Sequence, residues 1–287
     1  MENLRDFLER SYVAFNRPEF IDPDPLLVAR EFASVEDREI ASLVASCLAV
    51  GSAPLIVKAT RDIIHRMGNE PRAFLESAGA GTKCRGRHGT ASGGGYADLA
   101  SAFDGFRYRF FSGDDIASLL FGVKQVIGTR GSLGDAFSSF VKKGDETVLG
   151  ALESFVDEIV RASGKRTFVK NLLPSPAGKS ACKRPLLFLR WMIRADAVDP
   201  GGWDRSLVPT LVQPMDTHMT WVAEKFCFIP GGRPANLNTA IEVTRRFREI
   251  SEADPVKYDF CLTRPGIHPE LSRDDWFCGL TTRSENR

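Results

Sequence analysis

The sequence lacks several features that would place it in a specialised class. It contains no run of about 18 apolar residues, so we expect no transmembrane helix and no membrane partner. The first residues are charged and amphipathic, unlike a signal peptide, so we expect a cytoplasmic protein. The 287 residues carry a net charge of only +1, which argues against a protein that coats nucleic acid with its whole surface.

The cysteines form no pattern that binds a metal or performs thiol exchange. None of the six belongs to a C-x-x-C pair, so we expect no zinc site and no redox motif. They also lack the close spacing that ligates an iron–sulfur cluster. We therefore expect reduced thiols and no metal or cofactor. The cysteines are Cys47, Cys84, Cys182, Cys227, Cys261 and Cys278.

The remaining pattern is that of a helical globular protein. A hydrophobic content of 43% and a charged content of 26% are ordinary for a soluble chain of one large domain or two lobes. Apolar residues recur at helical spacing, and no segment from 96 to 164 alternates as a strand would, so the fold class is predicted to be all-α. Helices are expected over 3–15, from 25, over 34–50, 55–67, 71–77, 116–128, 132–143, 146–164, 182–194, 214–226 and 238–250.

Two segments stand out from this helical pattern. Residues 78–95 are rich in glycine and poor in hydrophobic residues, which predicts a flexible loop. Residues 98–115 contain four phenylalanines with Arg107 and Arg109 between them, a mixture that could stack on nucleic-acid bases. Aromatic residues at helical spacing are more typical of a core, and we favour that interpretation. The four are Phe103, Phe106, Phe110 and Phe111.

Residues 164–184 concentrate positive charge. The segment holds six basic residues and no acidic one, which suits a phosphate backbone, although a solvated basic loop has the same composition. Pro185 is tolerated in the first turn of a helix, so the next helix is predicted to begin near Arg184, with Lys183 at its N-terminus.

Lys183 and Asp216 are candidate catalytic residues. A helix N-terminus and burial both disfavour a charged amine, and a neutral amine can attack C1′ of a nucleotide to form a Schiff base. Asp216 opens the helix predicted over 214–226, where an aspartate commonly caps the free backbone N–H groups. Its carboxylate could also stabilise a cationic sugar or accept the proton of the amine.

Two motifs resemble the helix-hairpin-helix DNA glycosylases. P-M-D-T-H (214–218) resembles their V-D-T-H segment, in which the aspartate is catalytic and opens a helix. N-L-L-P-S-P-A-G-K-S-A (171–181) is similar to their L-P-G-V-G-x-K-T-A hairpin, with Ser175 at the first glycine and the second displaced to Gly178. The wide spacing of lysine and aspartate is similar to that in archaeal 8-oxoguanine glycosylases. We prefer Lys183 as the nucleophile, and Lys179 is the alternative.

This resemblance implies a two-lobed helical fold and further site residues. One lobe is expected to combine residues 1–77 and 205–287, and the other to span 96–204 with a degenerate hairpin. A base pocket is expected from Trp191, Trp221, Lys257 and Asp259, although core packing and a surface ion pair are alternatives. The residues expected to bind DNA are Lys165, Arg166, Lys170, Gly178, Ser180, Arg184 and His218.

The chain as a whole also resembles an uncharacterised bacterial family of conserved hypothetical proteins. The shared segments are N-R-P-E-F, C-K-R-x-x-x-F-L-R-W-M-x-R, P-x-D-T-H and D-P-V-K-Y-D-F. Function is therefore expected through the glycosylase resemblance: a monomeric glycosylase and lyase that removes a flipped oxidised base, with 8-oxoguanine as the best candidate, from duplex DNA. A nucleic-acid-binding protein without catalysis is the alternative, and a helical interaction protein unrelated to DNA is a third.

Overall fold

Helices form most of the protein, as the sequence predicts. The computed structural model describes residues 2–80, 94–164, 172–178, 180–268, 271–272 and 276. The expected all-α class is confirmed, and the order of helices follows the predicted one. The helices are α1 (Glu2–Phe15), α2 (Leu26–Arg30), α3 (Val35–Cys47), α4 (Ala53–Arg66), α5 (Pro71–Ser77), α6 (Gly94–Ala102), α7 (Gly113–Arg130), α8 (Leu133–Ser138), α9 (Leu149–Ala162), α10 (Lys183–Ile193), α11 (Thr217–Lys225), α12 (Leu237–Ile250) and α13 (Asp259–Thr263).

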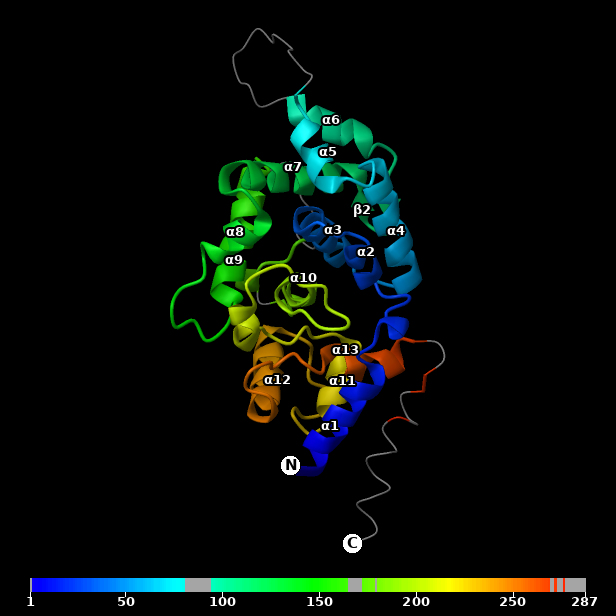
Figure 1. Ribbon diagram of the computed structural model, residues 1–287, viewed down its shortest axis with the longest axis vertical. Helices are drawn as coiled ribbons and strands as arrows, with labels where there is room; N and C mark the ends of the chain where they lie inside the picture. Colours follow the sequence, from blue (N-terminus) through cyan, green and yellow to red (C-terminus); the bar gives the residue numbers. More distant parts are fainter. Residues whose placement is uncertain are drawn as a thin grey trace.

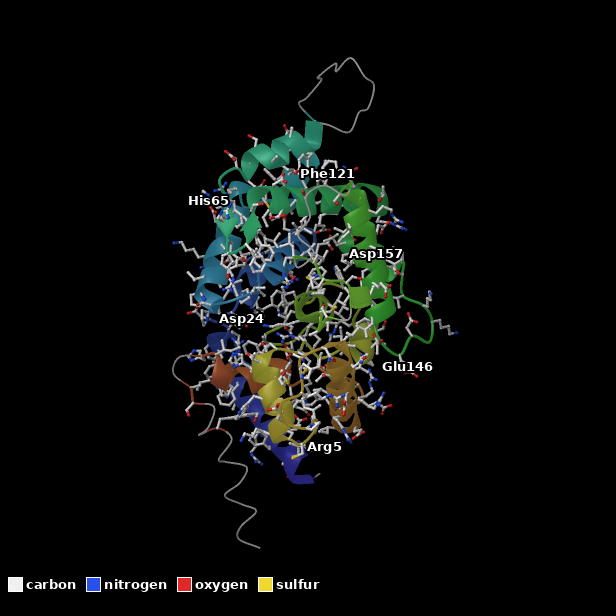
Figure 2. The ribbon with its side chains drawn as sticks, turned by 180° about the vertical axis from the view of Figure 1, so that it is seen from behind. Arg5, Asp24, His65, Phe121, Glu146 and Asp157 are labelled. Carbon is white, nitrogen blue, oxygen red and sulfur yellow. The ribbon has the colours of Figure 1, made fainter. Side chains whose placement is uncertain are left out.

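The helices are arranged along one long axis. Helices α5, α6 and α7 lie at one end, and α1, α11, α12 and α13 lie at the other (Figure 1). Helix α10 lies between these groups and packs on α3. Side chains fill the space between the ribbons along the whole length, and Asp24 lies near the junction of the two groups (Figure 2). The predicted division into two lobes remains a prediction; the structure shows α1 against α13 and α5 against α7.

Helix boundaries are set by capping residues that the sequence displays. Ser34 begins α3 and accepts a hydrogen bond from the backbone N–H of Asp37 at 3.2 Å. Ser112 begins α7 with a reciprocal capping box to Asp115.

Between α7 and α9 the backbones approach closely at Gly122, because a β-carbon there would lie 2.5 Å from the carbonyl oxygen of Ile159.

The absence of strands was predicted for 96–164, and this prediction is wrong. Strand β1 (Arg107–Tyr108) pairs antiparallel with β2 (Phe111–Ser112) in a short hairpin. The chain reverses because Arg109 adopts a left-handed conformation with φ of 54°. Phe103, Phe106 and Phe111 are buried, as predicted for core residues, whereas Phe110 is 52% exposed. The structural reason is that Phe110 lies at the tip of the hairpin.

Helix α8 ends at Ser138, earlier than the predicted 143, and residues 81–93 of the predicted glycine-rich loop lie outside the described residues. None of the helices in the described part of the chain is long and apolar enough to cross a membrane.

Candidate active site around Lys183 and Asp216

Lys183 is the first residue of α10, as the sequence predicts. Cys182 precedes it in a left-handed conformation with φ of 47°, and its backbone N–H donates to the hydroxyl of Ser180 at 3.3 Å. Pro185 lies in the first turn, where its missing N–H leaves no helical bond unmade. The sharp turn at Cys182 therefore sets the direction in which α10 begins and places Lys183 at its N-terminus.

Asp216 caps α11 and pairs with Lys183 at the same time. Its Oδ1 accepts the backbone N–H of Met219 at 2.8 Å, and its Oδ2 lies 3.0 Å from Nζ of Lys183. Capping of α11 and pairing with Lys183 thus use different oxygens of the Asp216 carboxylate. The side chains are 33% exposed at Lys183 and 17% at Asp216, so the pair borders solvent.

The surroundings of Asp216 keep it ionised. Burial raises the pKa of this carboxyl, but the charge of Lys183 and the hydrogen bonds from Met219 and Lys183 outweigh burial and lower the pKa below its ordinary value. The charge of His218, in the first turn of α11, acts in the same direction. A carboxylate with a lowered pKa beside an amine is suited to stabilising positive charge that develops nearby.

A buried ionic network lies behind this pair. Arg190, two turns along α10 from Lys183, pairs with Asp199 at 3.0 Å and with Asp259 of α13. Gln213, three residues before Asp216, donates its side-chain amide to the other oxygen of Asp259. The network therefore connects the helix that carries Lys183 with the segment that carries Asp216. Sequence reasoning did not assign Arg190, Asp199 or Gln213, although a charged residue on the apolar side of α10 is a signal of buried pairing.

Asp259 has an unusual titration for an aspartate. Burial raises its pKa to about 6, the charge of Arg190 opposes this change, and the negative charges of Asp216 and Asp199 add to it. Asp259 was expected at the edge of a base pocket; it is 4% exposed and lies inside the network instead. We therefore remove Asp259 from the proposed pocket.

The network continues through Arg194 at the end of α10. Its guanidinium donates to Asp254 at 3.0 Å, to Asp196 at 2.9 Å and to Asp199. Tyr12 of α1 donates its hydroxyl to Asp196 at 3.0 Å. Segments that carry the resemblance to the uncharacterised family therefore meet here, because they supply both arginines, Asp216, Asp254 and Asp259.

Two residues of the expected base pocket, Trp191 and Lys257, form other contacts in the structure. Trp191 is 1% exposed in a core cluster with Ile21 and Phe260, so we remove it from the proposed pocket. Lys257 pairs with Glu9 at 2.7 Å, which is the ion pair considered as its alternative. Trp221 is partly buried against the main core, with Nζ of Lys225 5.6 Å from its ring centre.

Six of the seven expected DNA-binding residues fall into three groups, and the seventh, His218, lies in the first turn of α11. Arg184 has structural contacts, since its guanidinium donates to the carbonyl oxygens of Cys47 at 3.0 Å and Leu172 at 3.2 Å. Gly178 and Ser180 are exposed in the hairpin segment, where Pro176–Gly178 forms a turn of 3-10 helix and Ser180 bridges to Asn236. Lys165, Arg166, Lys170 and the alternative nucleophile Lys179 lie outside the described residues.

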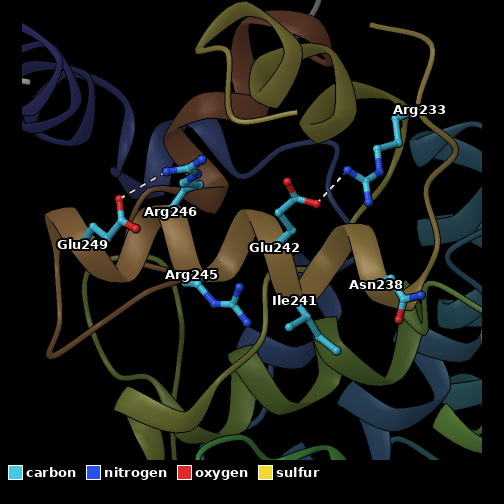
Figure 3. A pocket seen from close by; sticks show the side chains of 7 residues that line it. All are labelled: Arg233, Asn238, Ile241, Glu242, Arg245, Arg246 and Glu249. Atoms are coloured by element: carbon cyan, nitrogen blue, oxygen red, sulfur yellow. Dashed lines mark ion pairs between the residues drawn. The ribbon is translucent and has the colours of Figure 1, made fainter. Parts of the chain in front are cut away.

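A hollow along α12 is charged but does not contain the pair. Arg233 pairs with Glu242 at 2.7 Å on its rim, and Arg246 faces Glu249 at 3.7 Å (Figure 3). Neither Lys183 nor Asp216 lines it. Within the described ranges, no group of three or more His, Cys, Asp or Glu side chains could hold a metal ion.

Comparison with known proteins gives a family but no activity. No curated protein matches the chain. No solved structure matches it either. Residues 24–268 match a family described as "Protein of unknown function (DUF2400)", and this span includes both Lys183 and Asp216. The chain therefore belongs to the DUF2400 family.

Proposed function

We propose that the protein is a DNA glycosylase and abasic-site lyase that removes a flipped oxidised base, with 8-oxoguanine as the first candidate. The observation that supports this most is the distance of 3.0 Å between Nζ of Lys183 and Oδ2 of Asp216, each at the N-terminus of its helix. An amine and an ionised carboxylate in contact are the two groups that the chemistry requires.

The proposed reaction proceeds as follows. Nζ of Lys183 first loses its proton to water, and the neutral amine forms a bond to C1′ of the nucleotide while the bond from C1′ to the base nitrogen breaks. One proton of the resulting secondary ammonium passes to the leaving base. The nitrogen lone pair then forms a second bond to C1′ as the bond from C1′ to the ring oxygen breaks, and the ring oxygen takes a proton from water, which leaves a protonated Schiff base. Asp216 stabilises the cationic sugar, because its lowered pKa suits an ionised partner better than a proton acceptor.

A flipped base must be accepted outside the duplex stack. Both side chains are partly exposed, which is the access from solvent that a flipped sugar requires. Of the expected pocket residues, Trp221 remains a proposed wall, because it lies on α11 and is partly buried rather than enclosed. His218, in the first turn of the same helix, remains a proposed phosphate contact.

Borohydride trapping tests this function. The protein is incubated with duplex DNA that carries 8-oxoguanine or an abasic site, and hydride reduces the Schiff base to a stable amine. We expect a covalent adduct with the wild type and none with Lys183→Gln. Lys183→Arg is the matched control, because it keeps a positive charge beside Asp216 but cannot form a Schiff base. Lys179→Gln tests the alternative nucleophile.

The outcomes separate the possible functions. An adduct that persists in Lys183→Gln and disappears in Lys179→Gln would move the nucleophile to Lys179. Salt-dependent DNA binding without base release or adduct, over a panel of lesions, would contradict the enzyme and favour a nucleic-acid-binding protein. Absence of any salt-dependent binding would favour a helical interaction protein instead.

A further inference from the structure

The hairpin formed by β1 and β2 presents an aromatic ring to solvent. Phe110 is 52% exposed, whereas Phe111 beside it is fully buried. The two rings lie 4.5 Å apart between centres. The exposed ring of Phe110 therefore packs against the buried ring of Phe111.

The backbone at the hairpin tip is held in place despite strain. Arg109 has φ of 54°, a conformation that a non-glycine residue adopts at a cost and that is retained where the surroundings fix it. Its guanidinium lies against the backbone of Gly51, where a β-carbon would be 2.6 Å from Nη1. The hydroxyl of Tyr108 donates to the carbonyl oxygen of Val50 at 2.8 Å. The hairpin is thus anchored on the turn between α3 and α4.

The hairpin also contacts the first turn of α10. The guanidinium of Arg184 lies over the ring of Phe111, 6.0 Å from its centre, and donates to the carbonyl oxygen of Cys47 at the end of α3. Arg184 directly follows Lys183. Arg184 therefore links the hairpin to the helix that begins with Lys183. In Figure 1 the hairpin lies beside α4 and next to α3.

The charge around Phe110 fits an anionic partner. Arg107 and Arg109 are exposed on either side of Tyr108, and neither forms an ion pair with another described residue. Arg107 shares a hollow with Asp104 and Asp114, which offset its charge. The guanidinium of Arg109 lies against Gly51. Arg109 is therefore the basic neighbour of Phe110 whose charge these aspartates do not offset.

We infer that Phe110 and Arg109 form a contact for a strand of nucleic acid at the edge of the Lys183–Asp216 site. The ring of Phe110 stacks on an exposed base, and the guanidinium of Arg109 binds a phosphate. Stacking on an aromatic ring tolerates any base, and base flipping leaves an unstacked neighbour that needs such a partner. This inference rests on the proposed function for the identity of the nucleic acid.

Fluorescence anisotropy with duplex DNA containing a tetrahydrofuran abasic analogue tests the contact, because this probe cannot react with Lys183. We expect Phe110→Ser to weaken binding by about tenfold through loss of stacking. We expect Arg109→Gly to reduce the slope of log K against log salt by about one, as loss of a single phosphate contact requires. Glycine also accepts the left-handed backbone at this position, and the hydrogen bond from Tyr108 to Val50 still anchors the hairpin.

The matched controls are Val13→Ser and Arg10→Ala on α1, at the far end of the molecule. Val13 is 67% exposed and Arg10 is exposed, so these changes remove an apolar and a basic side chain of similar accessibility. We expect both controls to bind as the wild type does. Equal loss of affinity in the controls and the hairpin variants would overturn the inference.

The outcomes for the hairpin and for the enzyme are distinguishable. If the wild type binds and both hairpin variants bind equally well with an unchanged salt slope, the contact is overturned, while trapping on a true abasic site still decides the lyase activity. If the hairpin variants lose binding but no adduct ever forms, the contact is supported and the lyase activity is overturned. Absence of salt-dependent binding by the wild type overturns both.

Discussion

Arg190 and Asp259 form a buried ion pair that joins α10 to α13. The same carboxylate accepts the side-chain amide of Gln213, which precedes Asp216 by three residues. Because α10 begins with Lys183 and Gln213 precedes α11, Asp259 connects the two segments that carry the candidate catalytic groups. Among the described residues Arg190 forms no hydrogen bond or ion pair with Lys183 or Asp216, so we regard it as a positioning residue.

Replacing Arg190 should destabilise the protein strongly. Arg190→Met leaves Asp259 in the interior without its cation, and loss of one partner from a buried pair costs about 3–5 kcal/mol. Urea unfolding measures this change. The matched control is Arg61→Ala, which breaks an exposed pair with Glu31 and should cost less than about 1 kcal/mol. A loss in Arg190→Met no larger than in the control would contradict the network's structural role.

The raised pKa of Asp259 predicts a defined pH dependence of stability. Its pKa is about 6 in the folded protein against 3.8 for an ordinary aspartate, so the folded state holds a proton between these values that the unfolded state has lost. The stability contributed by this group is therefore complete below about pH 4 and is lost as the pH rises through 6.

Subtraction of a variant isolates this effect from other titrating groups. The free energy of unfolding of the wild type minus that of Asp259→Asn should fall between pH 4 and pH 7 by an amount on the order of 3 kcal/mol. Denaturant unfolding at a series of pH values gives both quantities. A difference that is constant with pH, or that rises, would show that Asp259 is not the group with the raised pKa.

Asp216 has two separable roles that different substitutions can distinguish. Asparagine caps a helix about as well as aspartate, whereas alanine does not, so Asp216→Ala should be less stable than Asp216→Asn by about 1 kcal/mol. Both variants lose the negative charge beside Lys183, so both should lose adduct formation. The measurements are urea unfolding and borohydride trapping.

The cap of α12 supplies the control for Asp216. Asn236 accepts the backbone N–H of Thr239 at 3.0 Å, and Asn236→Ala should cost a similar free energy without changing adduct formation. If Asp216→Asn traps DNA as efficiently as the wild type, Asp216 acts as a cap alone.

The helices could be predicted because their signals are local. Ser34 begins α3 and Asp216 begins α11 through hydrogen bonds to their own helices, and these contacts depend only on neighbouring sequence. The hairpin could not be predicted, since each strand has only two residues and shows no alternation. Its reversal depends on a left-handed arginine that rests on Gly51, a contact between distant segments.

The sequence predicts which residues belong to the candidate site, but not which residues surround them in the fold. Lys183 and Asp216 are candidates because the segments 171–181 and 214–218 resemble glycosylase motifs and both residues stand at predicted helix N-termini, yet no sequence pattern gives the distance between them. The burial of Trp191 and Asp259 depends on which face of α10 meets α13 and the segment around Ile21. Such contacts between distant elements decide whether a tryptophan lines a pocket or fills a core.

Two glycines of α7 provide an internal test of the helix packing. A β-carbon at Gly122 would lie 2.5 Å from the carbonyl oxygen of Ile159 in α9, whereas nothing lies within 4 Å of one at Gly128. Gly122→Ala must push the helices apart and should destabilise the protein by about 1–3 kcal/mol. Gly128→Ala should stabilise it by about 0.5–1 kcal/mol, because alanine favours a helix and meets no neighbour. Thermal unfolding of both variants measures these effects, and a stabilising Gly122→Ala would mean that α7 and α9 do not pack as closely as described.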